Sequence, residues 1–210
     1  HDGPAFFPSR IFFNYLLEAV TMLIEGVDAR AIEKQAVAAG FAVSPLAVLD
    51  EISLPLMLHV YDELPTLSAS QKRCYHFIQN LTDQGRLGRK SGKGFYQYDP
   101  ATGKKELCPD LRLPYHKEFT TTQDSLIRTR LLHVMAVDSY RCLESGILSQ
   151  PVDGDLGSIL GVGYAAHTGG VFSHMDQVGL ERFVQDCDAF KEKGEKWEVP
   201  ASLRALAKKQ

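Results

Sequence analysis

The sequence predicts an all-α fold built from two tandem helical units related by a pseudo-twofold axis. Apolar residues recur at helical spacing through most of the 210-residue chain, and strand character is confined to a short stretch, GFYQY at 94–98. A second observation is that the segment from Arg10 can be aligned with the segment from Arg130, which indicates an internal duplication. Two copies of a helical unit bury their apolar faces on each other, as the subunits of a twofold dimer do.

The first unit, residues 1–103, opens with a predicted helix over 10–24 whose apolar stripe is wide. Ser9 is expected to be its N-cap, and Gly26 follows its end. Asp28 is expected to cap a second helix, which ends at Gly40. These local signals predict two consecutive helices before residue 41.

The next helix is expected to begin with Ser44 as N-cap and Pro45 in its first turn, and Pro55 should break or kink it. Another helix is expected over 70–84. A glycine-rich basic segment then leads into the short strand and a turn over 99–103. Residues 104–122 have weak periodicity and are interpreted as a linker between the units.

The second unit, residues 123–210, is also expected to be helical. Its first helix covers 126–143 and ends before Gly146. A short glycine-rich helix over 151–163 follows, then a helix over 169–190, and a last helix after Pro200. The linker and the two units together account for the whole chain.

The alignment of the halves places Glu18 on Asp138 and residues 44–54 on 170–180, with a short insertion near 165–169. Asp50 then meets Asp176. An acidic residue repeated in both copies is expected to act as a cap or in a buried ion pair, and Arg10 and Arg130 are the candidate partners. These residues are therefore assigned to structure rather than to chemistry.

Composition excludes several classes of protein. The net charge is −3 and the pI is near 6.2, which does not fit a nucleic-acid surface. The apolar stretches are shorter than the roughly 20 residues that span a bilayer, and the start of the sequence lacks the pattern of a signal peptide. The 4 cysteines form no CxxC pair, so neither a zinc site nor a disulfide framework is expected. Reduced thiols favour a cytosolic or organelle-matrix protein.

Candidate residues for chemistry are sparse. The histidines fall in none of the usual catalytic motifs, and His133 and His174 are expected to be structural, whereas His167 in a glycine-flanked loop stays open. The segment GRKSGKGF at 88–95 contains no Walker motif and is interpreted as a tight loop. The alternative is that Lys90 and Lys93 contact anionic groups, such as the phosphates of a nucleotide-bearing substrate. Taken by themselves, these residues do not indicate that the chain is an enzyme.

Several ordered motifs resemble a known family. The segments DGPAFFPSR (2–10), EGVDARAIEKQAVAAGFAVSPLAVLDEISL (25–54) and GRLGRKSGKGFYQY (85–98) resemble the C-terminal domain of 3-hydroxyacyl-CoA dehydrogenases. The second half, with RCLESGI, DGDLGSILGVGY, GGVFSHMDQVG and WEVPASLRALA, resembles the long, duplicated form in the multifunctional α-subunit of the fatty-acid β-oxidation complex. The resemblance extends from residue 2 to about 208. It implies the helical fold of the 6-phosphogluconate/3-hydroxyacyl-CoA dehydrogenase C-terminal type.

The resemblance also implies an activity, the oxidation of 3-hydroxyacyl-CoA with NAD as cofactor. In the family, a preceding Rossmann domain supplies the NAD site and the catalytic His–Glu pair, and neither is recognised in this sequence. The C-terminal domain contributes a polar residue, usually Asn, at the position of Ser9. The implied catalytic residue is Ser9, and the implied substrate-binding residues are Phe6, Ser9, Lys90 and Lys93. This fragment alone is expected to be inactive.

The sequence departs from the family pattern at Ala5, Ser9, Ala42 and Ser44, where Gly, Asn, Pro and Gly are usual. These changes are expected to affect substrate preference more than fold. The implied partners are acyl-CoA and the Rossmann domain of the same protein. The main alternative is a non-catalytic assembly module that docks a thiolase subunit, and a dehydrogenase of short hydroxy acids is a weaker one. The implied compartment is the cytoplasm for a bacterial protein and the mitochondrial matrix or peroxisome for a eukaryotic one.

Overall fold

The structure is a computed structural model that describes residues 7–111 and 121–209. Within these residues it is mainly helical, as the sequence predicts, and it contains one two-stranded sheet. The helices of the first unit are α1 (Phe7–Ile24), α2 (Ala29–Ala38), α3 (Pro45–Ile52), α4 (Leu54–Asp62) and α5 (Ala69–Asp83). Those of the second unit are α6 (Thr121–Glu144), α7 (Pro151–Val162), α8 (Val171–Val178), α9 (Leu180–Ala189) and α10 (Ala201–Ala207).

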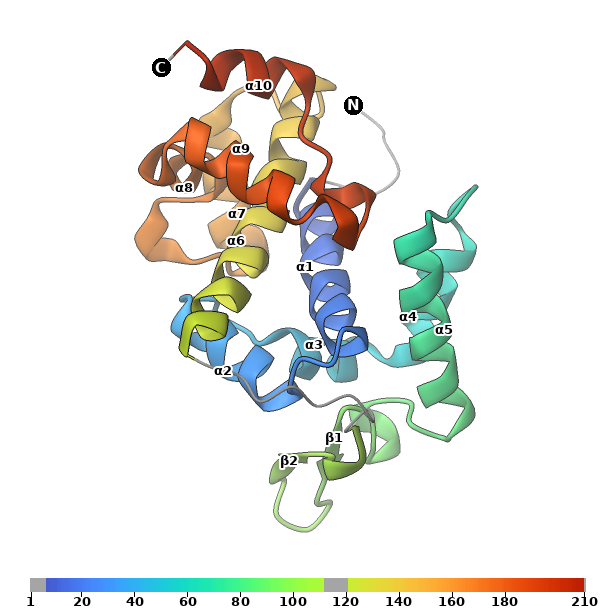
Figure 1. Cartoon of the computed structure of the whole chain (residues 1–210). Helices are drawn as coiled ribbons and strands as arrows, with labels where there is room; N and C mark the ends of the chain where they lie inside the picture. The colour runs from blue at the N-terminus through green and yellow to red at the C-terminus, as the bar shows by residue number, and fades with distance from the viewer. Residues whose placement is uncertain (1–6, 112–120, 210) are drawn as a thin grey trace.

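The sheet pairs β1 (Tyr96–Tyr98) with β2 (Lys105–Leu107) in antiparallel register, with Tyr96 opposite Leu107. It lies at the end of the first unit farthest from the second (Figure 1). Strand β2 falls inside the segment interpreted from sequence as an irregular linker. Strand pairing there depends on the partner strand, so weak periodicity alone did not reveal it. The division of the chain at 103 and 122 stays a prediction.

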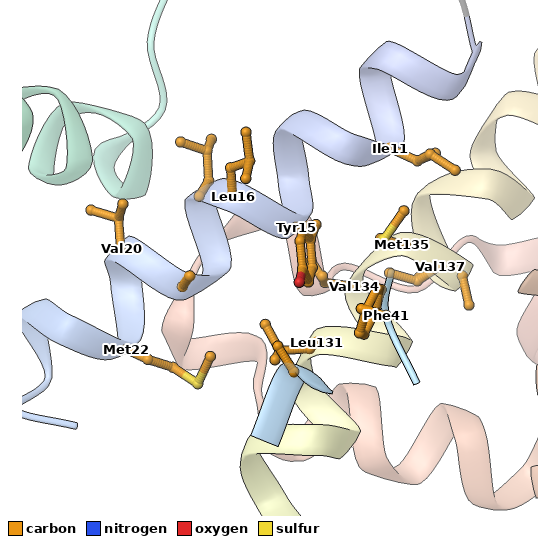
Figure 2. Close-up of a cluster of buried hydrophobic side chains, with 14 of the residues drawn as sticks. Ile11, Tyr15, Leu16, Val20, Met22, Phe41, Leu131, Val134, Met135 and Val137 are labelled. Atoms are coloured by element: carbon orange, nitrogen blue, oxygen red, sulfur yellow. The ribbon is translucent and has the colours of Figure 1, made fainter. Parts of the chain in front are cut away.

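Helices α1 and α6 form the centre of the molecule and pack on each other (Figure 1). In the close-up of Figure 2, Tyr15 of α1 points toward Val134 and Met135 of α6. All three side chains are fully buried. Phe41 stacks on Tyr15, with ring centroids 4.4 Å apart. The apolar stripe expected on the first helix is therefore what joins the two halves.

The two halves exchange ion pairs across this interface. Arg10 of α1 binds Asp138 of α6, with Nε 3.2 Å from Oδ2. Arg130 of α6 binds Glu18 of α1, 2.5 Å from Oε1, and its guanidinium also reaches Glu25. The sequence alignment that matched Arg10 with Arg130 and Glu18 with Asp138 is thus realised as reciprocal contacts. This reciprocity is the signature of a pseudo-twofold axis.

The sequence suggested that Arg10 and Arg130 pair with Asp50 and Asp176. The structure does not contain these pairs among the described residues. Asp50 is buried and accepts hydrogen bonds from the backbone of Phe95 and Tyr96, both at 2.8 Å, while Asp176 is exposed. The expectation that these two aspartates share one repeated role is wrong. Asp50 holds the glycine-rich loop of the first unit, a role that the exposed Asp176 does not share among the described residues.

A second pair of equivalent acids does share a role. Glu33 of α2 accepts the backbone N–H of Leu46 at 2.8 Å, in the first turn of α3. Asp155 of α7 accepts the backbone N–H of Phe172 at 2.7 Å, in the first turn of α8. Each carboxylate therefore satisfies the N-terminal donors of the following helix. Sequence alignment did not reveal this match.

The backbone also repeats at the junction after α3 and α8. Ser53 has φ 77° and ψ 140°, and Gly179 has φ 85° and ψ 130°. The single helix expected over 169–190 is therefore two helices, α8 and α9, because the chain turns at Gly179. The break expected from Pro55 is confirmed, with α3 and α4 separated at Ser53.

The first helix begins at Phe7, so Ser9 lies within its first turn and is not its N-cap. Pro8 fits there because the first turn needs no N–H from that residue. Asp28 caps α2 as expected, and its side chain accepts the N–H of Arg30 at 2.7 Å. Ser44 precedes α3, but its hydroxyl donates to Glu33 instead of capping the helix.

Candidate functional site

A groove of about 1110 Å³ runs beside α1, between that helix and the hairpin of α4 and α5. Residues of the second unit close one of its ends. The side chains and backbone that line it are Ser9, Arg10, Phe12, Phe13, Asn14, Leu16, Leu17, Ala42, Val43, Val48, Ile52, Met57, Val60, Leu64, Ser68, Ser70, Gln71, Cys74, Asp138, Arg141, Gly161, Val162, Gly163, Glu195 and Lys196. The groove therefore depends on both units.

One part of the groove is apolar. On α1, Phe12, Phe13 and Leu16 follow Ser9 at spacings of three, four and seven residues, which places them along one side of the helix. Val48 and Ile52 do the same on α3. Met57, Val60 and Leu64 extend the lining along α4 and just past its end. We call these three stripes the apolar trough.

The other part of the groove is polar and charged. Arg10 and Asp138 meet there, and Arg141 lies 3.3 Å from Asp138 and donates to the carbonyl of Lys196 at 2.9 Å. Burial opposes the charge of Arg10, but Asp138 outweighs it and raises the pKa of the guanidinium. The first turn of α1, which carries Ser9, is thereby tied to the second unit.

Lys196 brings a further cation to this polar end from the turn after α9. Its Nζ lies 3.1 Å from Oε2 of Glu18 and 3.1 Å from Oγ1 of Thr21. Cys74 lies 3.5 Å from the same hydroxyl, and burial raises the pKa of its thiol. Cys74 is therefore a neutral thiol at neutral pH and is not activated as a nucleophile.

The residues singled out from sequence are distributed unevenly around this groove. Ser9 is exposed at its rim. Phe6 lies outside the described residues. Lys90 and Lys93 are in the loop before β1 and are not among the described residues that line the groove. Their role in substrate binding stays a prediction, as does that of Ser9.

The glycine-rich loop is organised around Asp50. Besides the two backbone donors, the hydroxyl of Tyr98 donates to Asp50 at 2.9 Å. A Cβ on Gly94 would lie 2.1 Å from Oδ1 of Asp50, and one on Gly88, at φ 111°, would lie 2.5 Å from its backbone oxygen. The glycines are needed for this close packing. Asp50 thus ties the loop to α3 of its own unit, and contact of Lys90 and Lys93 with phosphate groups stays a prediction.

The buried histidines form a separate pair in the second unit. Nε2 of His174 lies 3.1 Å from Nδ1 of His133, and the His133 ring stacks on Phe183. Burial lowers the pKa of His133 to about 3 and that of His174 to about 4, with His174 also lowering the pKa of His133 and His167 that of His174. Both are neutral near pH 7, and their packing in the core supports the structural role expected for them.

Two further statements concern only the described part of the chain. No group of three or more His, Cys, Asp or Glu side chains there could hold a metal ion. None of its helices has the length and apolar character needed to cross a membrane.

Proteins of known sequence and structure share features with this chain. Residues 6–98 match the family model of the 3-hydroxyacyl-CoA dehydrogenase C-terminal domain. This part of the chain is therefore similar in sequence to that domain. Similarity to the fatty acid oxidation complex subunit alpha continues through the second unit, at 31% identity over 208 residues for the protein of Shewanella oneidensis and 32% over 209 for that of Shewanella amazonensis. Each comparison covers 98% of this chain and 30% of the relative.

Two solved structures share the fold. The dehydrogenase part of multifunctional enzyme 1 from Caenorhabditis elegans superposes with a TM-score of 0.71 at 22% identity, over 97% of this chain and 48% of that one. The 3-hydroxybutyryl-CoA dehydrogenase of Escherichia coli K12 gives 0.68 at 19% identity, over 99% and 60%. The chain thus shares the fold of these two structures over both of its units.

Sequence reasoning missed several residues that line the groove. The sequence predicts a helical segment that includes Val60 and Leu64. Their spacing does not indicate that they line a groove beside α1. Lys196 lies in a short 3-10 turn (Glu195–Trp197) with no periodic signal. The match of Glu18 with Asp138 was the sequence signal that could have located the charged end of the groove. Matched charges in a duplicated chain indicate contacts across the interface between the two copies.

Proposed function

We propose that this chain is the substrate-side part of an NAD-dependent 3-hydroxyacyl-CoA dehydrogenase that acts in fatty-acid β-oxidation, within a longer, multifunctional protein. The observation that carries the proposal is the position of Ser9. It occupies the family's polar position and lies at the rim of a large, mostly apolar groove. A polar group beside an apolar cleft suits a substrate with a reacting hydroxyl and a hydrocarbon tail.

In this proposal, the residues of the chain bind and orient the substrate. The Ser9 hydroxyl would hydrogen-bond the polar head of the acyl group, directly or through a water molecule. The apolar trough would shield the tail from water. As the family resemblance implies, the cofactor and the catalytic base would be held by a Rossmann domain of the same protein. The cytoplasm of a bacterium, or the mitochondrial matrix or peroxisome of a eukaryote, is the corresponding compartment.

The test is an assay of the full-length protein with 3-hydroxyacyl-CoA and NAD, followed by the appearance of NADH. We expect turnover, and we expect the chain alone to give none, also in the reverse direction with acetoacetyl-CoA and NADH. Ser9→Ala in the full-length protein should lower kcat/KM by about tenfold, the value of one hydrogen bond. A full-length protein without any dehydrogenase activity would refute the proposal.

A second candidate function is an assembly module, and the surface of α7 favours it. Val152, Leu156 and Leu160 lie at spacings of four along this helix and are 53%, 55% and 81% exposed. An apolar stripe of this kind suits a protein interface. The partner proposed from the family resemblance is a thiolase subunit. Co-purification lost in Leu160→Asp and kept in Glu192→Ala, an exposed 3-10 residue, would support docking through α7.

A further inference from the structure

We infer that the second unit positions Ser9, with Asp138, Gly157 and Gly161 as positioning residues for the dehydrogenase site. This inference rests on the proposed function and names the residues outside the first unit on which that site depends. Helices α6 and α7, which carry these three residues, lie against one side of α1, and the α4–α5 hairpin lies on the other (Figure 1). Ser9 is exposed on the first turn of α1, at the rim of the groove.

The residues before Ser9 are held by α7. Phe7 is buried, and a Cβ on Gly157 would lie 3.1 Å from its Cε1 atom. A Cβ on Gly161 would lie 3.0 Å from Cβ of Pro8. Carbon atoms in ordinary contact are about 3.5–4.0 Å apart, so the absence of a side chain at both positions lets the first turn of α1 lie this close to α7. The two glycines are on the same face of α7, because they are separated by one helical turn.

The other side of the turn is held by α6. Arg10 donates to both carboxylate oxygens of Asp138, each at 3.2 Å. Asp138 is 3% exposed and is itself held by Arg141, whose Nη1 lies 3.3 Å from Oδ1. Arg141 also donates to the backbone carbonyls of Lys196 and Glu198. The ion pair is thus fixed to the second unit at several points, and its two parallel hydrogen bonds set direction as well as distance.

These contacts lie on both sides of Ser9 along the chain. Residues 7, 8 and 10 all contact the second unit, whereas Ser9 itself lines the groove. The residues of one helical turn move together, because the backbone joins them. A small shift at Pro8 or Arg10 is therefore transmitted to the Ser9 hydroxyl. Such shifts matter in a catalytic site, where the productive geometry has to be held to within about 0.5 Å.

The internal duplication offers a comparison. The equivalent pair, Arg130 with Glu18, is buried on both sides, and neither residue is among the described residues that line the groove. Arg10 and Asp138 both line it. The same contact is therefore made twice, once inside the interface between the units and once at the rim that carries Ser9. We expect the first pair to act on stability and the second to act also on the position of Ser9.

The experiment measures kcat/KM of the full-length protein with 3-hydroxyacyl-CoA and NAD. In Gly161→Ala the new Cβ displaces Pro8 and, with it, Ser9. Alanine favours a helix more than glycine does, so the urea midpoint of this variant should stay close to that of the wild type. We expect kcat/KM to fall about threefold or more, up to the roughly tenfold loss expected for Ser9→Ala.

Asp138→Asn tests the other side of the turn. It keeps the shape of the side chain but removes the charge that holds Arg10, and its loss of kcat/KM should be of the same order. Asp188→Asn is the control. Asp188 pairs with Arg204 in the same unit, and neither is among the described residues that line the groove. This variant should keep the wild-type kcat/KM.

Double variants separate positioning from a general loss of structure. If Gly161 and Asp138 act through Ser9, their substitution has no further effect once Ser9 is replaced by alanine. Adding Gly161→Ala or Asp138→Asn to Ser9→Ala should then leave kcat/KM within about twofold of Ser9→Ala alone. Losses that multiply in the double variants, or wild-type kcat/KM in both single variants, would overturn the inference.

Hydrogen–deuterium exchange of the full-length protein tests the same inference without substrate. Backbone amides at the start of α1 should exchange faster in Asp138→Asn than in the wild type, and Asp188→Asn should not change them. If no acyl-CoA is turned over but this difference in exchange is found, the second unit holds the turn and the proposed function fails. If neither is found, both fail. Dehydrogenase activity and exchange that Gly161→Ala and Asp138→Asn leave unchanged refute only the positioning role.

Discussion

Arg10 and Asp138, 128 positions apart in the chain, form an ion pair that joins the rim of the groove to the second unit. Its counterpart joins Arg130 to Glu18. The two pairs are related by the internal duplication, but their surroundings differ. The Arg10 side chain is 36% exposed, whereas the side chains of Arg130 and Glu18 are 5% and 0% exposed. Because of this difference in burial, we expect the two ion pairs to contribute unequally to the free energy of unfolding.

Replacing Arg130 by Met should destabilise the protein more than replacing Arg10 by Met. Arg130→Met leaves Glu18 buried with Lys196 as its remaining cation, and the loss of one partner of a buried pair costs about 3–5 kcal/mol. Arg10→Met removes a partly solvated charge and should cost about 1 kcal/mol. Urea unfolding of the two variants measures the difference. Equal midpoints would contradict this account of the interface.

Ser53→Gly should stabilise the protein by about 1 kcal/mol. Ser53 is the non-glycine residue with positive φ among the described residues, at 77°, and such a backbone costs about 1–3 kcal/mol for a side chain. Part of the gain is lost because glycine is more flexible when unfolded. The matched variant is Gly179→Ser, at φ 85°, where a Cβ meets no neighbour within 4 Å. It should lower stability by a similar amount, and thermal unfolding of both variants gives the comparison.

Gly94→Ala should cost about 3 kcal/mol or more of stability. The new Cβ would lie 2.1 Å from Oδ1 of Asp50, which would have to move away from the backbone donors of Phe95 and Tyr96. Gly85→Ala is the control, because it has φ 77° and open space around its Cβ, and it should cost about 1 kcal/mol. Chemical denaturation measures the free energy of unfolding of both variants. Similar losses of stability in the two would mean that the loop is not organised around Asp50.

Stability should fall below about pH 6.5 because of His133 and His174. Their folded pKa values are lowered by burial to about 3 and 4, so the unfolded chain binds protons at a higher pH than the folded one. Above pH 6.5 both histidines are neutral in the folded and in the unfolded chain. Stability is lost progressively as the pH falls from 6.5 to about 4 for His174 and to about 3 for His133. At pH 5 the loss is of the order of 1–2 kcal/mol for each histidine.

The measurement is the urea midpoint at pH 7.5 and pH 5. His174→Gln should weaken the pH dependence, because one of the two histidines no longer titrates on unfolding. His76→Gln, in the exposed part of α5, is the control that should leave it unchanged. A wild-type midpoint that does not change between these pH values would contradict the neutral pair.

Local chemistry determined much of the fold from sequence. The breaks at Gly26 and Pro55, the cap at Asp28 and the first-turn position of Pro45 depend on residues within one helical turn, so the sequence predicts them well. The duplication was also visible, because the apolar period and the matched charges recur at a nearly constant separation. The family motifs around Ser9 belong to this same local information.

Only the tertiary structure decided which distant side chains meet. The sequence offered Asp50 and Asp176 as candidate partners of the arginines, whereas the packing of α1 on α6 pairs Arg10 with Asp138. The groove was not predictable either, because it depends on how α4 and α5 pack beside α1 and leave Val60 partly exposed. The sequence by itself determined the helices, their ends and their repetition, since these depend on neighbours along the chain. The structure decided the groove and its charged end, since these depend on which helix faces pack and which are left uncovered.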